Sequence, residues 1–163
     1  MSRAVTGWVA FAVGLLLSSA LVSSCSYNWY KLDRDLNAVQ TRAQVAADRE
    51  DMLAYTQQFE ENLRKHNAID GHAALIFKTP RNDLALQHES VLKIIQRLES
   101  IKGVDRNTTT YQVALDDIRG TLREIPMLAG NLAWVRFAWW TLLIVLIGWP
   151  ILCLAGYAIG KGR

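Results

Sequence analysis

The segment that most constrains the fold is an uncharged run close to the C-terminus, residues 137–160, with the sequence FAWWTLLIVLIGWPILCLAGYAIG. About 20 predominantly apolar residues cross a bilayer as a helix, whereas a helix of a soluble domain is seldom apolar on every face. Aromatic residues crowd its start, as in the belt at a membrane interface: Trp134, Phe137, Trp139 and Trp140. The pattern predicts a transmembrane helix over residues 133–160, followed by a cytoplasmic tail at 161–163. The alternative, a core helix of a soluble domain, leaves too little other chain to cover it.

A second uncharged run, residues 4–30, follows Arg3 near the N-terminus. It is also long enough to span a bilayer, so we expect an uncleaved transmembrane anchor over residues 1–26. A basic residue followed by an apolar run and small residues is also typical of a cleaved signal peptide. Residues 21–25, LVSSC, resemble a bacterial lipobox, so lipidation of Cys25 is an alternative to the anchor.

The charged residues predict the orientation of the two spans. All 15 acidic residues lie between the apolar runs, in residues 27–132, whereas Arg3, Lys161 and Arg163 flank their outer ends. Basic residues near the ends of spans favour the cytoplasmic side. We therefore expect a bacterial inner-membrane protein with both termini in the cytoplasm and residues 27–132 in the periplasm. The middle region has no clustered basic patch, so nucleic-acid binding is not expected.

Small residues recur on one side of each predicted span. They are Ala10, Gly14 and Ser18 in the first span and Gly148, Gly156 and Gly160 in the second. Small residues allow the backbones of membrane helices to approach closely, so these positions predict helix packing within the chain or with another protein. The two cysteines, Cys25 and Cys153, lie about 25 Å apart in depth by helical rise, which is too far for a disulfide.

The middle region is predicted to hold three helices, at about 27–66, 80–102 and 109–125. The first segment contains neither Gly nor Pro, the second begins at a Thr79–Pro80 cap, and the third ends before Pro126. Apolar residues recur at helical spacing along all three. The predicted stripes are Leu32, Leu36, Val39, Ala43, Ala46, Met52, Tyr55, Phe59 and Leu63, then Leu84, Val91, Ile94, Ile95, Leu98 and Ile101, then Tyr111, Leu115, Ile118, Leu122 and Ile125.

The chain must leave the membrane and return to the same face, which restricts how these helices are arranged. The first helix would rise about 60 Å, and the second and third together would cover about the same length. We therefore expect an all-α membrane protein in which one long antiparallel helical hairpin, of coiled-coil type, joins two transmembrane helices. The alternative is a small helical bundle, but a four-helix bundle requires a break within residues 27–66, where no breaker residue occurs.

The residues that carry chemistry in enzymes do not form a recognisable pattern in this sequence. We find no Gly-rich phosphate loop, nucleophile elbow or HExxH motif, and His66, Asp70 and His72 do not have zinc-ligand spacing. Acidic and basic residues are interleaved, as on solvated helix faces. We therefore expect no enzymatic activity, no catalytic residues, no cofactor and no bound metal.

A hairpin of two helices has a thin core, so we expect this chain to require self-association or another membrane protein as its partner, besides the lipid bilayer. The local candidate for partner binding is the apolar cluster Leu75, Ile76 and Phe77, at the tip of the hairpin far from the membrane. The alternative is that these residues fold back and cap the hairpin.

The leading functional hypothesis is a non-enzymatic scaffold or accessory subunit of a larger inner-membrane or envelope complex. The layout of span, helical periplasmic region and span is also similar to the sensor half of bacterial chemoreceptors and histidine kinases. Those proteins continue into a cytoplasmic signalling domain, whereas this sequence ends three residues after Gly160. The resemblance therefore implies a sensor-like input module that signals through a separate partner. A third possibility is a phage or envelope-stress factor that modulates another membrane protein.

Overall fold

The computed structural model describes residues 3–74 and 76–160, in which helices are joined by turns and loops and there is no β-strand. The predicted all-α class is therefore confirmed for the described part of the chain. The chain divides into two compact units. Unit 1 comprises Met1–Trp29 and Ala133–Arg163, and unit 2 comprises Tyr30–Leu132.

Unit 1 is built from the two apolar ends of the chain. Helix α1 (Arg3–Leu32) supplies the first part, and α6 (Leu128–Leu143), a π-helical turn η3 (Ile144–Gly148) and α7 (Trp149–Gly160) supply the second. Large apolar side chains of α1, such as Trp8 and Leu16, are 68% exposed. Among the described residues, one helix, Phe11–Val45, is long and apolar enough to cross a membrane. Several side chains of the C-terminal segment lie outside the described set.

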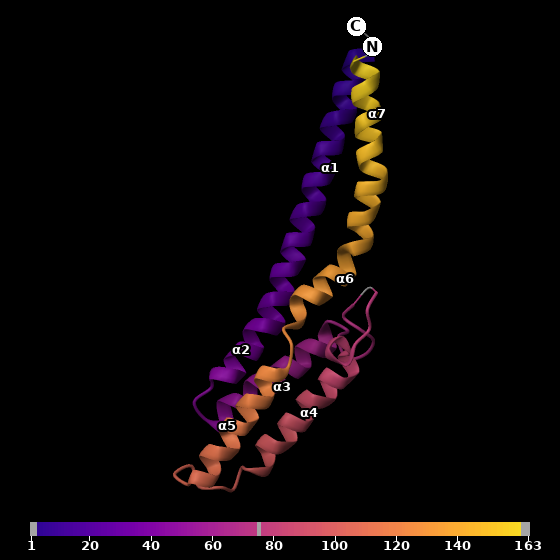
Figure 1. Cartoon of the computed structure of the whole chain (residues 1–163). Helices are drawn as coiled ribbons and strands as arrows, with labels where there is room; N and C mark the ends of the chain where they lie inside the picture. The colour runs from indigo at the N-terminus through magenta and orange to yellow at the C-terminus, as the bar shows by residue number, and fades with distance from the viewer. Residues whose placement is uncertain (1–2, 75, 161–163) are drawn as a thin grey trace. The chain divides into compact units, whose positions relative to one another are not determined.

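Unit 2 is a four-helix bundle. After the π-helical turn η1 (Asp33–Asn37), its helices are α2 (Ala38–Val45), α3 (Arg49–Lys65), α4 (Leu84–Ser100) and α5 (Thr109–Glu124). Each helix contacts the next, and α5 contacts α2, so the four close a ring with one core between them (Figure 1). Fully buried core side chains include Leu36, Met52, Phe59, Leu63, Val91, Ile94, Leu98, Leu115, Ile118 and Leu122.

The predicted continuous helix over residues 27–66 is wrong, because the chain turns back between Val45 and Arg49. Ala46 leaves the helix with φ −58° and ψ 133°, and Asp48 then caps α3 by accepting a hydrogen bond from the Asp51 amide at 2.9 Å. The carbonyls of Ala46 and Ala47 accept hydrogen bonds from Arg119 Nη2 at 2.7 and 3.3 Å. The turn thus depends on capping rather than on Gly or Pro.

This turn also makes the predicted two-helix hairpin wrong. Because α3 folds back against α2 instead of continuing from it, four shorter helices share the core that two long arms were expected to share. Unit 2 corresponds to the alternative, a small helical bundle. The thin core that motivated an obligatory partner is therefore absent from unit 2.

The segment between α3 and α4 contains a short 3₁₀ turn, η2 (Pro80–Asn82), which Thr79 caps. The helix that was expected to start at this cap starts only at Leu84, where Asp83 accepts from the Ala85 and Leu86 amides. Asn67, with φ 48°, ends α3 in a left-handed conformation, and the Ala68 amide donates to the Leu63 carbonyl at 2.8 Å. Gly71, with φ 79°, adopts a backbone conformation that favours glycine. An isolated antiparallel bridge joins His72 to Asp83 and closes the base of the loop.

The two ends of unit 2 differ in what they contain. We name as the near end the one where the chain enters at η1 and leaves after α5; there Lys65 Nζ lies 3.8 Å from Asp35 and the Ala129 amide donates to Asn37 Oδ1 at 3.3 Å. The far end holds the α2–α3 turn and the α4–α5 connection. The α3–α4 loop begins at the near end, because His66, the first residue after α3, contacts Asp35 of η1 (Figure 1). Within unit 2, the segment that was expected at the tip opposite the entry of the chain therefore lies at the end where the chain enters.

Candidate functional site

A buried carboxylate marks the near end of unit 2. Asp35 lies in the π-helical turn η1, and only 8% of its surface is exposed. π-Helical turns are rare and occur frequently at functional sites. Asn62 of α3 donates from Nδ2 to the Asp35 backbone carbonyl at 2.6 Å, so this turn is fixed to α3.

Three basic side chains surround the Asp35 carboxylate. Arg34 donates from Nε to Oδ1 at 3.0 Å, His66 Nε2 lies 3.0 Å from Oδ2, and Lys65 Nζ lies 3.8 Å from Oδ2. Burial favours a raised pKa for Asp35 and is the largest single influence. The hydrogen bonds from His66 and Arg34 and the charges of Arg34 and Lys65 outweigh it, so the pKa lies below the usual 3.8.

The low pKa assigns the roles in the contact between Asp35 and His66. Asp35 is ionised at neutral pH and can only accept hydrogen bonds, so His66 donates from Nε2. This contact joins the first turn of unit 2 to the residue that follows α3. This hydrogen bond therefore holds the segment where the chain enters unit 2 against the rest of the bundle.

A second carboxylate, Glu60, joins α3 to α4 in the same way. Its Oε1 lies 2.8 Å from His88 Nε2 and 2.5 Å from Arg64 Nε. Burial again acts to raise the pKa of Glu60, but the hydrogen bonds and charges of His88 and Arg64 lower it below the usual 4.5. The third histidine, His72, lies 3.8 Å from Asp83 at the base of the α3–α4 loop.

At the far end, a buried arginine holds three helices together. The Arg49 amide donates to Tyr111 Oη at 3.1 Å, and its Nη1 donates to the Leu98 carbonyl at 3.3 Å. Its Nη2 pairs with Glu50 at 2.7 Å, and Arg106 pairs with the same carboxylate at 2.6 Å. The hydrogen bond from Arg49 is the largest cause of the lowered pKa of Glu50.

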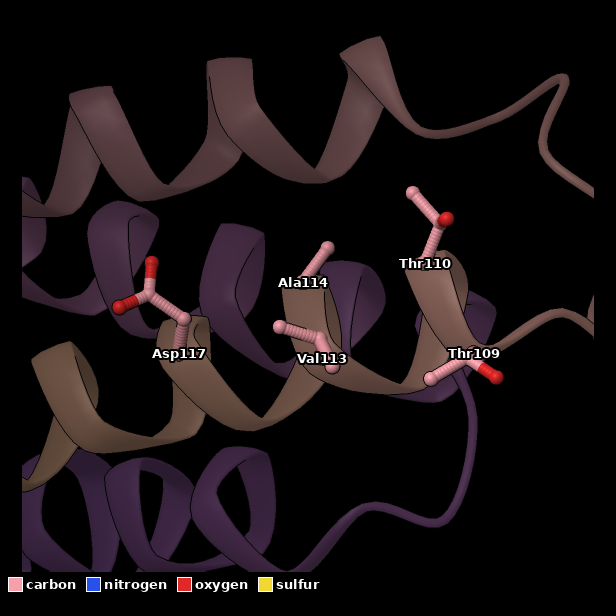
Figure 2. A pocket seen from close by; sticks show the side chains of 5 residues that line it. All are labelled: Thr109, Thr110, Val113, Ala114 and Asp117. Carbon is pink, nitrogen blue, oxygen red and sulfur yellow. The ribbon is translucent and has the colours of Figure 1, made fainter.

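A shallow hollow of about 530 Å³ lies on the outer face of α5 (Figure 2). It is lined by Thr109, Thr110, Val113, Ala114 and Asp117. Asp117 is paired with Arg97 of α4. Ligand sites for small molecules are usually enclosed cavities, whereas this hollow is open and all of its lining residues lie on one helix.

The predicted partner-binding cluster is only partly described. Leu75 lies outside the described residues, whereas Ile76 and Phe77 are 78% and 80% exposed. These two side chains do not fold back onto the bundle, so the alternative in which they cap it is wrong. Asn82 Nδ2 donates to the Phe77 carbonyl at 2.8 Å, which fixes the backbone of the loop from within.

The small residues of the predicted spans remain candidates for helix packing. Ser18 donates from Oγ to the Gly14 carbonyl of its own helix at 2.8 Å. A Cβ atom added at Gly156 would meet no neighbouring atom within 4 Å. The burial of Ala10 and Gly160 lies outside the described set, and Gly148 closes the turn η3. Packing at these positions stays a prediction.

The polar clusters of unit 2 gave little signal in the sequence. Asp35 and Glu60 lie in helical segments in which acidic and basic residues alternate, a pattern typical of exposed helix faces, and His66 belongs to no recognised ligand pattern. The contacts of Asp35 with Lys65 and His66 can be predicted only once the turn at Asp48 is recognised, because a continuous helix would hold these residues far apart. Among the described residues, no group of three or more His, Cys, Asp or Glu side chains could hold a metal ion.

Comparison of the chain with models of protein families, with curated proteins and with solved structures found no match.

Proposed function

We propose that this protein is a non-enzymatic scaffold or accessory subunit of a larger bacterial inner-membrane or envelope complex. Two transmembrane helices, over residues 1–26 and 133–160, anchor it with both termini in the cytoplasm. Unit 2 is then a periplasmic four-helix bundle that contacts other membrane proteins or a second copy of the chain.

One observation carries this proposal: the chain enters and leaves unit 2 at the same end. The Asn37 side chain accepts from the Ala129 amide, so the first and last turns of unit 2 lie next to each other. Apolar helical segments precede the first turn and follow the last one. A bundle connected in this way emerges from one face of a bilayer and returns to it without a further crossing.

The use of polar residues in unit 2 supports a structural role. Asp35, Glu60 and Arg49 are each engaged with groups of a neighbouring helix, and the contacts join α3 in turn to η1, α4 and α5. Catalytic groups are more often poised toward a cavity that admits a substrate. Groups that hold helices together suit a domain that presents its surface to another protein.

A sensor-like input module is the second candidate, and the continuity of two helices favours it. Both α1 (Arg3–Leu32) and α6 (Leu128–Leu143) run unbroken across the boundaries between the two units. A helix without a break can carry a small shift from a folded domain into a membrane segment. A separate signalling partner would then read that shift.

Mild detergent extraction from the host membrane, followed by native electrophoresis, tests the proposal. We expect the 18.3 kDa chain to migrate in a stable complex far larger than its dimer, with other proteins present in the band. The matched control is the same chain purified alone, which should migrate as a small oligomer. A free dimer in the host extract that changes its melting temperature with a small molecule would contradict the subunit role and favour the sensor.

A further inference from the structure

We propose that the α3–α4 loop, through Ile76, Phe77 and Lys78, inserts into the headgroup region of the bilayer that holds the apolar helices. Unit 2 would then rest with its near end on an anionic lipid surface. This inference depends on the proposed membrane anchoring and adds a third point of membrane contact to it.

The first observation is the exposure of two adjacent apolar side chains. Phe77 is 80% exposed and Ile76 is 78% exposed, more than any other large apolar side chain described in unit 2. Exposed apolar surface in water is unfavourable, and contiguous exposed apolar residues often mark sites of protein or membrane contact. An occupant is therefore expected for this loop.

The second observation is the position of the loop within unit 2. His66, the residue before the loop, contacts Asp35, five residues after Tyr30 begins unit 2. The loop therefore lies at the end of unit 2 that covalent bonds join to the apolar segments. The connecting helix carries exposed aromatic side chains at Tyr27, Trp29 and Tyr30, as expected at the depth of a membrane interface.

The third observation is that the backbone of the loop is held in place. The Ala73 amide donates to the Asn82 carbonyl at 2.7 Å, and the Leu84 amide donates to the Gly71 carbonyl at 2.9 Å. Asn82 Oδ1 also accepts from the Thr79 amide at 3.0 Å. These bonds close the base of the loop, so that Ile76 and Phe77 are presented to the outside.

The charge of the loop determines which occupant fits. The loop contains Asp70 and Asp83, and Asp83 lies at its base beside His72, but residues 76–82 contain Lys78 and Arg81 and no carboxylate, and both basic side chains are exposed. An apolar pair followed by two basic residues fits an anionic phospholipid surface, where the apolar groups enter the interface and the basic groups meet the headgroups. A protein partner for the same loop is the competing outcome of the test.

The experiment uses the full chain, with Cys25→Ser and Cys153→Ser, in vesicles of phosphatidylethanolamine and phosphatidylglycerol. An environment-sensitive fluorophore is attached at Ile76→Cys, which leaves Phe77 in place, and nitroxide lipids quench it. Val113→Cys, an exposed apolar position toward the far end, is the matched control, and Leu16→Cys reports on α1. We expect blue-shifted emission and severalfold stronger quenching at Ile76→Cys than at Val113→Cys. Adding Phe77→Asp should remove most of that quenching.

Each of the other outcomes has a defined meaning. Quenching at Leu16→Cys with none at Ile76→Cys overturns the loop contact and leaves the membrane anchoring intact. A blue shift at Ile76→Cys that nitroxide lipids do not quench places the loop against protein and also overturns the inference. No quenching at Leu16→Cys contradicts the anchoring itself. Equal quenching in phosphatidylcholine vesicles would overturn the preference for anionic lipid.

Discussion

Asp48 decides where one helix of unit 2 ends and the next begins. Its side chain accepts from the Asp51 amide, one of the amides that lack a partner at the start of a helix, and Glu50 and Asp51 add negative charge to the first turn of α3. Arg119 binds the carbonyls on the other side of the turn. In the sequence, this turn is indicated by Asp48, a residue type that caps helices, followed by the acidic residues Glu50 and Asp51.

We predict that Asp48→Ala destabilises the fold by about 1 kcal/mol, because the first turn of α3 loses its cap. Asp48→Asn is the matched control: asparagine caps equally well, so the loss should be a few tenths of a kcal/mol at most. Urea unfolding of the full chain in detergent, followed by circular dichroism, measures both variants. Equal loss in the two variants would show that charge matters at this position and that capping does not.

Asp35 makes stability depend on pH in a defined direction. Its folded pKa lies below the usual 3.8, so the ionised carboxylate stabilises the fold at pH values above about 4. That contribution is lost as the pH falls through the folded pKa. The difference in unfolding free energy between the wild type and Asp35→Asn should therefore be largest at pH 7 and shrink toward pH 3.

Asp70→Asn is the control for this measurement, because Asp70 is an exposed carboxylate of the α3–α4 loop. Its effect on the unfolding free energy should be small at every pH. A difference between wild type and Asp35→Asn that stays constant from pH 7 to pH 3 would contradict a stabilising role for the ionised Asp35 carboxylate.

At the scale of helices, apolar spacing predicted the core well and the connections poorly. Nearly all residues of the predicted stripes are buried, including Leu36, Phe59, Ile94 and Leu122, because a residue that faces a core does so in a hairpin and in a bundle alike. Tyr55, Ile95 and Ile101 are only half-buried. The topology depends on the turn at residues 46–48. Asp48 caps the helix that follows this turn, and Arg119, distant in the sequence, binds its carbonyls.

The buried polar groups could not be predicted from spacing either. Gln40 donates from Nε2 to the carbonyls of Ile125 and Leu122 at 2.8 and 3.3 Å, a contact across more than eighty residues of sequence. Apolar periodicity shows which face of a helix is buried, but it does not show which polar group meets which carbonyl. Such pairs can be predicted only after the topology of the bundle is known.

The antiparallel packing of α2 on α3 predicts a short distance between Arg34 and Lys65. Both side chains contact Asp35, whereas a continuous helix would separate these residues by about 46 Å at 1.5 Å per residue. Spin labels at Arg34→Cys and Lys65→Cys, with both native cysteines replaced by serine, should lie about 10–25 Å apart, since packed helix axes are about 10 Å apart. A distance beyond about 40 Å would contradict the bundle and support the continuous helix of the two-helix hairpin.

At the scale of the whole molecule, the chain combines two kinds of helix. The helices of unit 2 have an apolar face and a polar face, and they cover each other. The N-terminal helix exposes apolar side chains on several faces, which only lipid or protein would cover. Since the chain enters and leaves unit 2 at one end, both apolar segments begin at that end.

Chemical labelling from the two sides of the membrane tests this central claim most directly. Single cysteines at Val113, in unit 2, and at Gly162, near the C-terminus, are introduced in turn into the chain without its native cysteines. In intact spheroplasts, a membrane-impermeant maleimide should label Val113→Cys at once and Gly162→Cys only after lysis. Labelling of both positions before lysis, or of both only after it, would place unit 2 and the C-terminus in one compartment and contradict the account.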